Sequence, residues 1–144
     1  MFLLTKVPAA YFAGLRVEEL EMQKASVSLR HSWFNKNPFH SVYFAALLMA
    51  GEISTGILCM AYLYKRNPGI SMLLIHNESN FYKKATGKII FTCADGIVIN
   101  EAVKKAVATG EATTVRCQSI GKNEQEEIVA DLYFTWSFKT RRKA

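Results

Sequence analysis

A single carboxylate, Glu52, lies near the middle of an apolar segment that runs from about Val42 to Tyr64. A charged side chain is costly to bury, so a carboxylate at this position needs either a partner or a chemical role. Burial also raises the pKa of a carboxyl group, which suits a general base near neutral pH. A polar loop with Asn37 and His40 leads into the segment. We therefore expect any chemistry of this chain to centre on Glu52 and this loop.

The same residues also have ordinary structural interpretations. Glu52 is equally consistent with a structural carboxylate, bonded to backbone, to Asn37, or to an Arg or Tyr across a subunit interface. Asn37 precedes Pro38 and fits a turn, while His40 fits a solvent-facing loop. Ser41 is better interpreted as a helix N-cap than as a nucleophile, because no His and Asp with recognisable spacing accompany it.

Two further pairs of side chains are candidates for contacts with a ligand. Ser54 and Thr55 follow Glu52 by about one helical turn and either line the same pocket or bond back to the helix backbone. Lys83 and Lys84 suit either the phosphates of coenzyme A or a solvated edge of a sheet.

The chain has 144 residues and a formal net charge of +6. Much of the excess charge is at Arg141, Arg142 and Lys143, and the other lysines are scattered, so we expect no nucleic-acid partner. The three cysteines are far apart in the sequence, as are the three histidines, and none has the spacing of metal ligands. We expect buried, reduced thiols, no metal site and a cytoplasmic location.

The apolar segment is long enough to cross a bilayer. Against a membrane span, Glu52 would lie near the bilayer centre at a cost of roughly 3 kcal/mol. Small and polar residues also fill the middle of the segment, and the rest of the chain has the pattern of half-buried strands that need a core. The segment is therefore expected to be a buried core helix. The first residues, Met1 to Lys6, are apolar but too short for a signal peptide.

Strands and short helices are predicted on both sides of this helix. Residues Pro8 to Leu15 suggest a short helix, and Arg16 to Glu21 either a strand or its continuation. From Lys24, apolar and polar residues alternate up to Trp33, which is typical of a strand with one buried face. After the central helix, Asn67-Pro68-Gly69 predicts a turn. The later expected elements are strands from Ile70 to Lys83, Gly87 to Ala94 and Glu111 to Ile120, a helix from Glu101 to Thr109 that stops at Gly110, and a last strand with Ile128, Ala130, Leu132, Phe134, Trp136 and Phe138 on its buried face.

Successive strands joined by short turns imply an antiparallel sheet. A helix that is apolar on nearly all sides must be wrapped by that sheet. The pattern therefore predicts one α+β domain over residues 1–144, with a curved antiparallel sheet around a long central helix.

This order of elements resembles the hot-dog fold from about residue 12 to residue 140. The segment around the helix resembles an uncharacterised branch of the hot-dog thioesterase superfamily, with an Asn-Pro-x-x-Ser-x-Tyr-Phe-x-Ala loop and helix followed by Ala-x-Glu. The matching residues are Asn37, Pro38, Ser41, Tyr43, Phe44, Ala46, Ala50 and Glu52. The run from Tyr82 to Lys88 is similar to a turn of that superfamily but lacks its proline, and Gly110-Glu111 resembles the start of its next strand.

The resemblance implies a homo-oligomer, a dimer or tetramer, that hydrolyses an acyl-CoA thioester bound between two subunits. Glu52 would be the general base or nucleophile, Asn37 would position water, and the N–H of Phe44 or Ala45 would hold the carbonyl oxygen. Coenzyme A would be part of the substrate, with no separate cofactor. The implied contacts with the substrate come from His40, Ser41, Tyr43, Phe44, Ala45, Thr55, Tyr82, Lys83 and Lys84.

The chain departs from the superfamily at the start of the helix. Tyr43-Phe44-Ala45 falls where characterised acyl-CoA thioesterases of this fold have His-Gly-Gly. Glycines let a ligand approach the backbone closely, whereas Tyr43 and Phe44 are bulky. This favours an alternative, a non-catalytic protein that binds an acyl chain or lipid. A third hypothesis is a dehydratase-like enzyme that uses His40.

Overall fold

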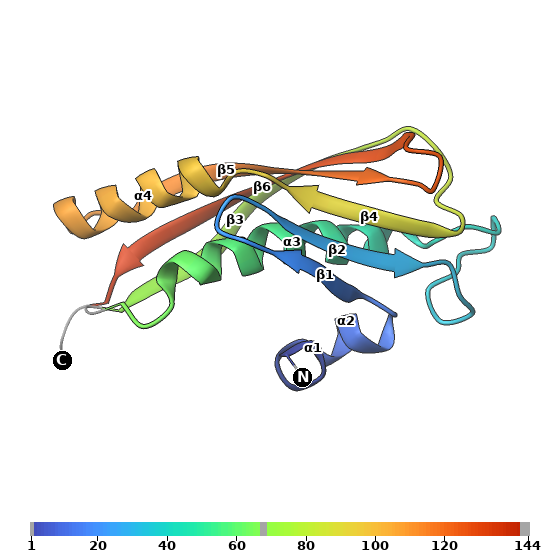
Figure 1. Cartoon of the computed structure of the whole chain (residues 1–144), viewed down its shortest axis with the longest axis horizontal. Helices are drawn as coiled ribbons and strands as arrows, with labels where there is room; N and C mark the ends of the chain where they lie inside the picture. The colour runs from blue at the N-terminus through green and yellow to red at the C-terminus, as the bar shows by residue number, and fades with distance from the viewer. Residues whose placement is uncertain (1, 67–68, 142–144) are drawn as a thin grey trace.

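The computed structural model describes residues 2–66 and 69–141. Figure 1 shows a long curved sheet with one helix running along it. The described elements are α1 (Phe2–Lys6), α2 (Pro8–Phe12), β1 (Arg16–Leu20), β2 (Ala25–Arg30), α3 (Phe44–Leu63), β3 (Ile70–Phe81), β4 (Lys88–Cys93), α4 (Gly96–Thr109), β5 (Thr113–Lys122) and β6 (Ile128–Thr140).

The six strands form one sheet in the order β1-β2-β4-β5-β6-β3, and every neighbouring pair is antiparallel. Helix α3 packs chiefly against β2, β4 and β5, and α4 packs against β5, β6 and α3. The predicted α+β architecture is confirmed. Strand β3 is an edge strand, so the side of α3 nearest β3 is the less covered side.

Helix α3 begins and ends within two residues of the predicted segment. It is the one described helix long and apolar enough to cross a membrane, with a mean hydropathy of 1.7, but 61% of that stretch is buried inside the molecule. Hydroxyl groups fix it against the sheet, since Ser54 Oγ is 2.7 Å from Ser119 Oγ on β5. This is the arrangement expected of a core helix.

Gly51 allows α3 to approach β6 closely. A Cβ at this position would lie 2.5 Å from Leu132 Cδ1 and 3.1 Å from Phe134 Cε2, and both side chains are buried. We expect Gly51→Ala to lower the free energy of unfolding by about 1–3 kcal/mol, despite the higher helix propensity of Ala. Gly56→Ala is the matched control, because its Cβ would lie 3.3 Å from the nearest atom, in Trp136. Denaturant titration of both variants tests this, and a Gly51→Ala protein as stable as wild type would contradict the packing argument.

The strand predicted from Lys24 to Trp33 is shorter than expected, and two parts of that prediction are wrong. Trp33 lies beyond β2 and is 77% exposed. Both faces of β2 are buried, because β2 lies inside the sheet and its outward serines bond to neighbouring strands. Ser26 Oγ is 2.9 Å from Thr92 Oγ1, and Ser28 donates to Glu18.

Other boundaries also differ from the sequence-based expectation. The segment after α2 is strand β1, one of the two predicted alternatives. Helix α4 begins at Gly96, not Glu101, because the turn between β1 and β2 packs on this glycine and Gly96 N–H donates to Gln23 O (3.2 Å). Gly110 ends α4, as predicted, and it has a left-handed conformation.

Ile128 was expected on the buried face of the last strand, but it is half exposed because a register shift ends the β5–β6 pairing there. The predicted Asn67-Pro68 turn lies outside the described residues.

Candidate functional site

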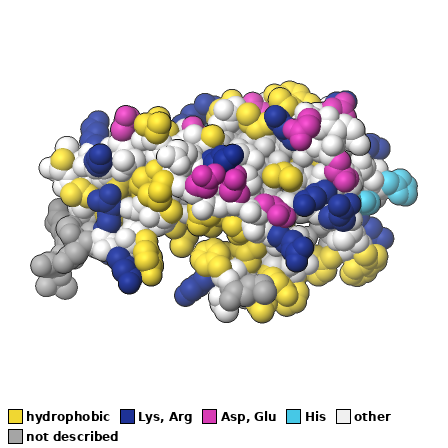
Figure 2. Space-filling view, viewed as in Figure 1, with side chains coloured by type: hydrophobic (Ala, Val, Ile, Leu, Met, Phe, Trp, Pro, Cys, Tyr) yellow, Lys and Arg dark blue, Asp and Glu magenta, His cyan; other side chains and the backbone are white. Residues whose placement is uncertain are grey.

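The loop before α3 and the segment after β3 meet at the N-terminal end of the helix. Val42 N–H donates to Ala85 O (2.9 Å), which joins the two segments. Together they line a hollow of about 310 Å³, whose lining includes Asn37, Ser41, Tyr43, Phe44, Lys83 and Lys84. The hollow therefore brings together most of the loop and lysine residues that the sequence singled out. Figure 2 shows histidine and basic side chains at this end of the molecule.

Asn37 organises the loop. Its Oδ1 accepts from the N–H groups of Phe39 (2.9 Å) and Ser41 (3.2 Å), and its Nδ2 donates to Ser41 Oγ (3.0 Å) and Val42 O (3.3 Å). Both polar atoms are thus used within the turn. In this arrangement the geometry favours the turn-residue interpretation of Asn37.

The N-terminus of α3 presents free backbone donors. The N-cap residue is Tyr43, not Ser41 as predicted, and no side chain caps the helix there. Tyr43 N–H donates to Asn35 O (2.7 Å), whereas the N–H groups of Phe44 and Ala45 have no acceptor among residues 2–66 and 69–141. Unpaired N–H groups at a helix N-terminus carry partial positive charge, which suits a carbonyl oxygen that is gaining negative charge.

An aromatic wall stands beside these donors. The rings of Tyr43 and Phe44 meet edge to face with centroids 5.1 Å apart, and Phe44 meets Phe81 of β3 at 6.3 Å. Tyr43 and Phe44 are each 50% exposed. The wall is therefore open to solvent in a single chain and is available to a partner subunit or an apolar ligand.

Glu52 lies two turns further along α3. It is half-buried, and this desolvation raises its pKa. Across the described part of the chain, no side chain donates a hydrogen bond or forms an ion pair with this carboxylate. A Cβ on Gly56 would be 3.9 Å from Glu52 Oε1 and 3.3 Å from Trp136, so the carboxylate and the indole both lie over this glycine. The arrangement keeps a carboxylate in apolar surroundings without a partner, which is a reactive combination.

The sequence matches the family described as "Domain of unknown function (DUF4442)" from residue 1 to residue 137. The chain belongs to the DUF4442 family. No curated protein matches the sequence of this DUF4442 protein.

Solved structures resemble the DUF4442 protein over nearly its whole length. The Pseudomonas aeruginosa protein PA5026, described as of unknown function and "Probable Thioesterase", is 20% identical with a TM-score of 0.85, over 97% of this chain and 92% of that chain. OLEI01261 from Chlorobaculum tepidum, of unknown function, is 11% identical with a TM-score of 0.83, over 97% and 91%. The Staphylococcus aureus thioesterase SAV0944 is 16% identical with a TM-score of 0.69, over 96% and 99%. At these identities the likeness shows the fold, and it confirms the predicted hot-dog fold.

The structure separates some predicted contact residues of the DUF4442 protein from the hollow. Thr55 is fully buried, donates to Glu52 O (2.9 Å) and accepts from Trp136 Nε1 (2.9 Å), so it bonds back to the helix. Tyr82 lines a different hollow of about 400 Å³ with Gln118 and Asp131. His40 has a φ of 63° and lines a third hollow, beside Asn37 and Lys36.

The two lysines already have partners within the chain. Lys83 Nζ lies 2.7 Å from Glu127 Oε2, and Lys84 Nζ donates to Phe39 O (3.2 Å). Both are exposed, so these contacts are weak and a phosphate could replace them.

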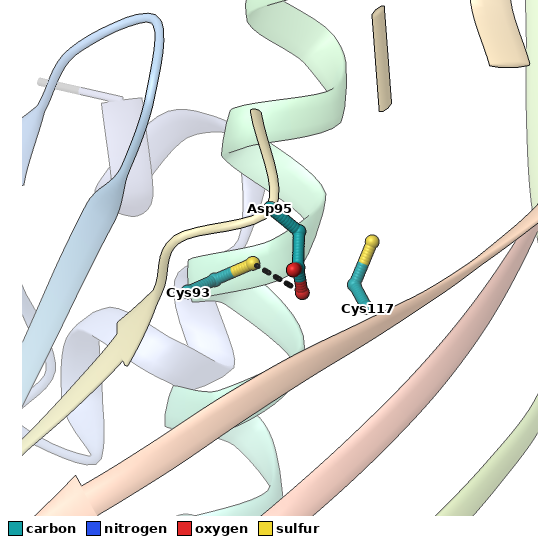
Figure 3. A group of neighbouring side chains, drawn as sticks. All are labelled: Cys93, Asp95 and Cys117. Atoms are coloured by element: carbon teal, nitrogen blue, oxygen red, sulfur yellow. Dashed lines mark hydrogen bonds between the residues drawn. The ribbon is translucent and has the colours of Figure 1, made fainter. Parts of the chain in front are cut away.

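Sequence reasoning missed a group of side chains that lies apart from this hollow. Cys93, Asp95 and Cys117 converge from the end of β4, the start of α4 and the middle of β5 (Figure 3). They are far apart in the sequence, so no local spacing could have indicated them.

Proposed function

We propose that the DUF4442 protein is a thioesterase-like hydrolase that acts on an acyl-CoA in a site shared by two subunits. The observation that carries this proposal is Glu52, an unpartnered and desolvated carboxylate on the central helix of a hot-dog fold. Further support comes from SAV0944. Two structures of that thioesterase carry replacements, one of a glutamine and one of a glutamate. The spacing between these two residues in its sequence equals the spacing between Asn37 and Glu52 in this chain.

In this mechanism Glu52 removes a proton from water, and the water oxygen attacks the thioester carbonyl carbon. The carbonyl oxygen gains negative charge and is held by the N–H of Phe44 or Ala45. The C–S bond then breaks, and the proton held by Glu52 passes to the leaving sulfur. The products are a carboxylic acid and coenzyme A. In the alternative direct attack, a Glu52 oxygen would take the place of that water and bond to the carbonyl carbon, the C–S bond would break to release coenzyme A, and water would then hydrolyse the mixed anhydride on Glu52.

The distance along α3 supports a site shared by two subunits. Phe44 and Glu52 are separated by eight residues, about 12 Å along the helix axis. A carbonyl oxygen must lie about 3 Å from its N–H donor, and the reacting carbon is only a bond length away from that oxygen. Within one helix, an extended Glu52 side chain and a bridging water would both be needed to span this distance, so a site built from one subunit is strained even though helical side chains lean toward the N-terminus. We infer that Glu52 of one subunit works with the N–H groups of the partner's helix.

The edge strand β3 is the surface we propose for pairing. It is 12 residues long and bonds only to β6 within the described sheet. Leu73 and Ile75 on it are 66% and 51% exposed. The other edge, β1, is only five residues long and carries the charged side chains of Arg16, Glu18 and Glu19, which disfavour pairing.

We expect light scattering at micromolar concentration to give at least twice the 16.2 kDa chain mass. Ile75→Asp would place a charge on the pairing edge and shift the protein to monomers. Ile97→Asp is the control, because Ile97 is 70% exposed on α4, away from β3. A wild-type monomer, or the same mass for both variants, would contradict pairing through β3.

A second candidate function is favoured by the aromatic wall. Phe44 falls where characterised acyl-CoA thioesterases of this fold have a glycine, and its ring packs against Tyr43 and Phe81, so an acyl chain could be bound without being cleaved. Thiol release from acyl-CoA substrates separates the two functions. A binding protein would show calorimetric binding of acyl-CoA with no free thiol produced.

A further inference from the structure

We propose that Cys93, Asp95 and Cys117 form a binding site for one Zn²⁺ ion, separate from the proposed thioesterase site. The three side chains each offer one ligand atom, and these atoms all lie within 4.8 Å of one another. Figure 3 shows the Cys93 thiol and the Asp95 carboxylate facing each other, with Cys117 on the neighbouring strand.

The site occupies a wedge where two strands separate. The pairing of β4 with β5 ends at Thr92 and Ile120. Beyond this point, Asp95 replaces the missing ladder bond, because its Oδ2 accepts from Gln118 N–H (2.7 Å). The same oxygen is 3.8 Å from Cys93 Sγ. The wedge thus holds a carboxylate and two thiols in a space that apolar side chains would otherwise fill.

The Asp95 side chain does not cap helix α4. It is the N-cap residue of α4, where an Asp side chain usually accepts from the first backbone N–H groups of the helix. Here the side chain makes no such bond and points to the sulfur atoms and Gln118 instead. A carboxylate directed at two buried thiols is not explained by packing of cysteines as small apolar residues.

The distances and chemistry fit zinc. In a tetrahedral site with Zn–S near 2.3 Å and Zn–O near 2.0 Å, neighbouring ligand atoms are about 3.5–3.8 Å apart. The cluster therefore needs to contract by only about 1 Å. Two thiolates and one carboxylate suit Zn²⁺ better than Mg²⁺ or Ca²⁺, which prefer oxygen ligands. Cys59 of α3 is a third buried thiol that raises the pKa of Cys117, but it lies outside the three-residue cluster.

Outer contacts already orient the ligands. Gln118 N–H donates to Asp95 Oδ2, and the Cys93 thiol donates to the same oxygen. Such bonds fix the direction of metal ligands. Without an ion, the neighbouring thiols and burial raise the pKa of both Cys93 and Cys117, so both are protonated. Binding would release these thiol protons to solvent. Asp95 is only half-buried, so the site lies near the surface.

Cobalt provides a visible probe, because Co²⁺ occupies zinc sites and thiolate ligands give it intense charge-transfer absorption. The reduced full-length protein, refolded with CoCl₂, is expected to bind one Co²⁺ per chain with this absorption, and Zn²⁺ should displace it. Cys93→Ser and Cys117→Ser should each weaken the affinity at least about tenfold. Wild-type protein with free thiols and no charge-transfer band at one equivalent would overturn the proposal.

Asp95→Asn separates loss of the metal ligand from loss of the fold. It removes the carboxylate, but its side-chain carbonyl can still accept from Gln118 N–H. We expect this variant to keep the wild-type circular dichroism and to lose at least about tenfold in Co²⁺ affinity. Asp131→Asn is the control, since Asp131 is also half-buried and bonds to Gln118, through Nε2 at 2.8 Å, but lies outside the cluster. Equal Co²⁺ affinities for Asp95→Asn, Asp131→Asn and wild type would overturn the proposal.

Discussion

Glu52→Gln is expected to lower kcat for an acyl-CoA substrate by about 10²–10⁴-fold, the usual contribution of a general base. Gln keeps the size and hydrogen-bonding capacity of the side chain but cannot accept the proton from water. KM should change little, because Glu52 acts on water and not on the bound acyl group. Steady-state kinetics on purified protein measures this. Glu101→Gln is the control, since Glu101 is an exposed helical glutamate of α4.

The raised pKa of Glu52 makes both kcat and stability depend on pH, each in a direction that can be predicted. The base must be ionised, so kcat should rise with pH through a pKa above the ordinary value for Glu, and this limb should be absent in Glu52→Gln. The contribution of Glu52 to the free energy of unfolding should instead fall as pH rises. A carboxyl group whose pKa is raised on folding favours the folded state most when protonated, so this contribution is lost as pH rises through the folded pKa. Glu52→Gln should therefore gain stability relative to wild type as pH rises, and a loss at neutral pH would instead indicate a structural carboxylate with a partner.

Phe44→Pro is expected to lower kcat by about 10²–10³-fold relative to Phe44→Ala, which is the effect of removing one donor to a developing oxyanion. The two variants both lose the aromatic ring, but only proline also removes the N–H. Proline is well tolerated at the first position of a helix. The preceding residue, Tyr43, already has an extended backbone with φ −60° and ψ 135°, which proline requires of its predecessor.

Mixing the two inactive variants tests whether the site is shared. In a mixed dimer of Glu52→Gln and Phe44→Pro subunits, one of the two sites combines an intact Glu52 with an intact N–H of the partner's Phe44. Heterodimers isolated with a different affinity tag on each subunit should therefore recover about half of the wild-type activity, and a randomly paired mixture about a quarter. Activity no higher than the sum of the two homodimers would show that both groups act within one chain. Equal rates for Phe44→Pro and Phe44→Ala would place the carbonyl oxygen elsewhere.

The parts of the fold that follow local rules could be predicted from the sequence. The alternation of apolar and polar residues predicted β6, the apolar run predicted α3, and Gly110 predicted the end of α4. Each of these patterns depends on residues that are close together in the chain. Boundaries failed where a distant contact overrides the local pattern. Gly96 begins α4 because another turn of the backbone packs on it, and Ser26 is buried because it bonds across the sheet.

The candidate site shows the same division. Glu52 could be identified because a charge within an apolar run is visible in the sequence alone. Ser41 was wrongly predicted as the helix cap because its hydroxyl bonds to Asn37 instead, a contact set by the shape of the loop. The convergence of Cys93, Asp95 and Cys117 depends on how three elements meet, so it is visible only in three dimensions. The pairing of two subunits is likewise inferred from distances along α3 and not from any motif.

The most direct test of the proposed function is thiol release from a panel of short, long and aromatic acyl-CoAs, measured on wild type and Glu52→Gln side by side. We expect wild type to turn over at least one class of acyl-CoA, and we expect this turnover to collapse in a Glu52→Gln protein with unchanged circular dichroism. No free thiol from any substrate, or equal rates for the two proteins, would contradict it and leave acyl-chain binding as the function of this fold.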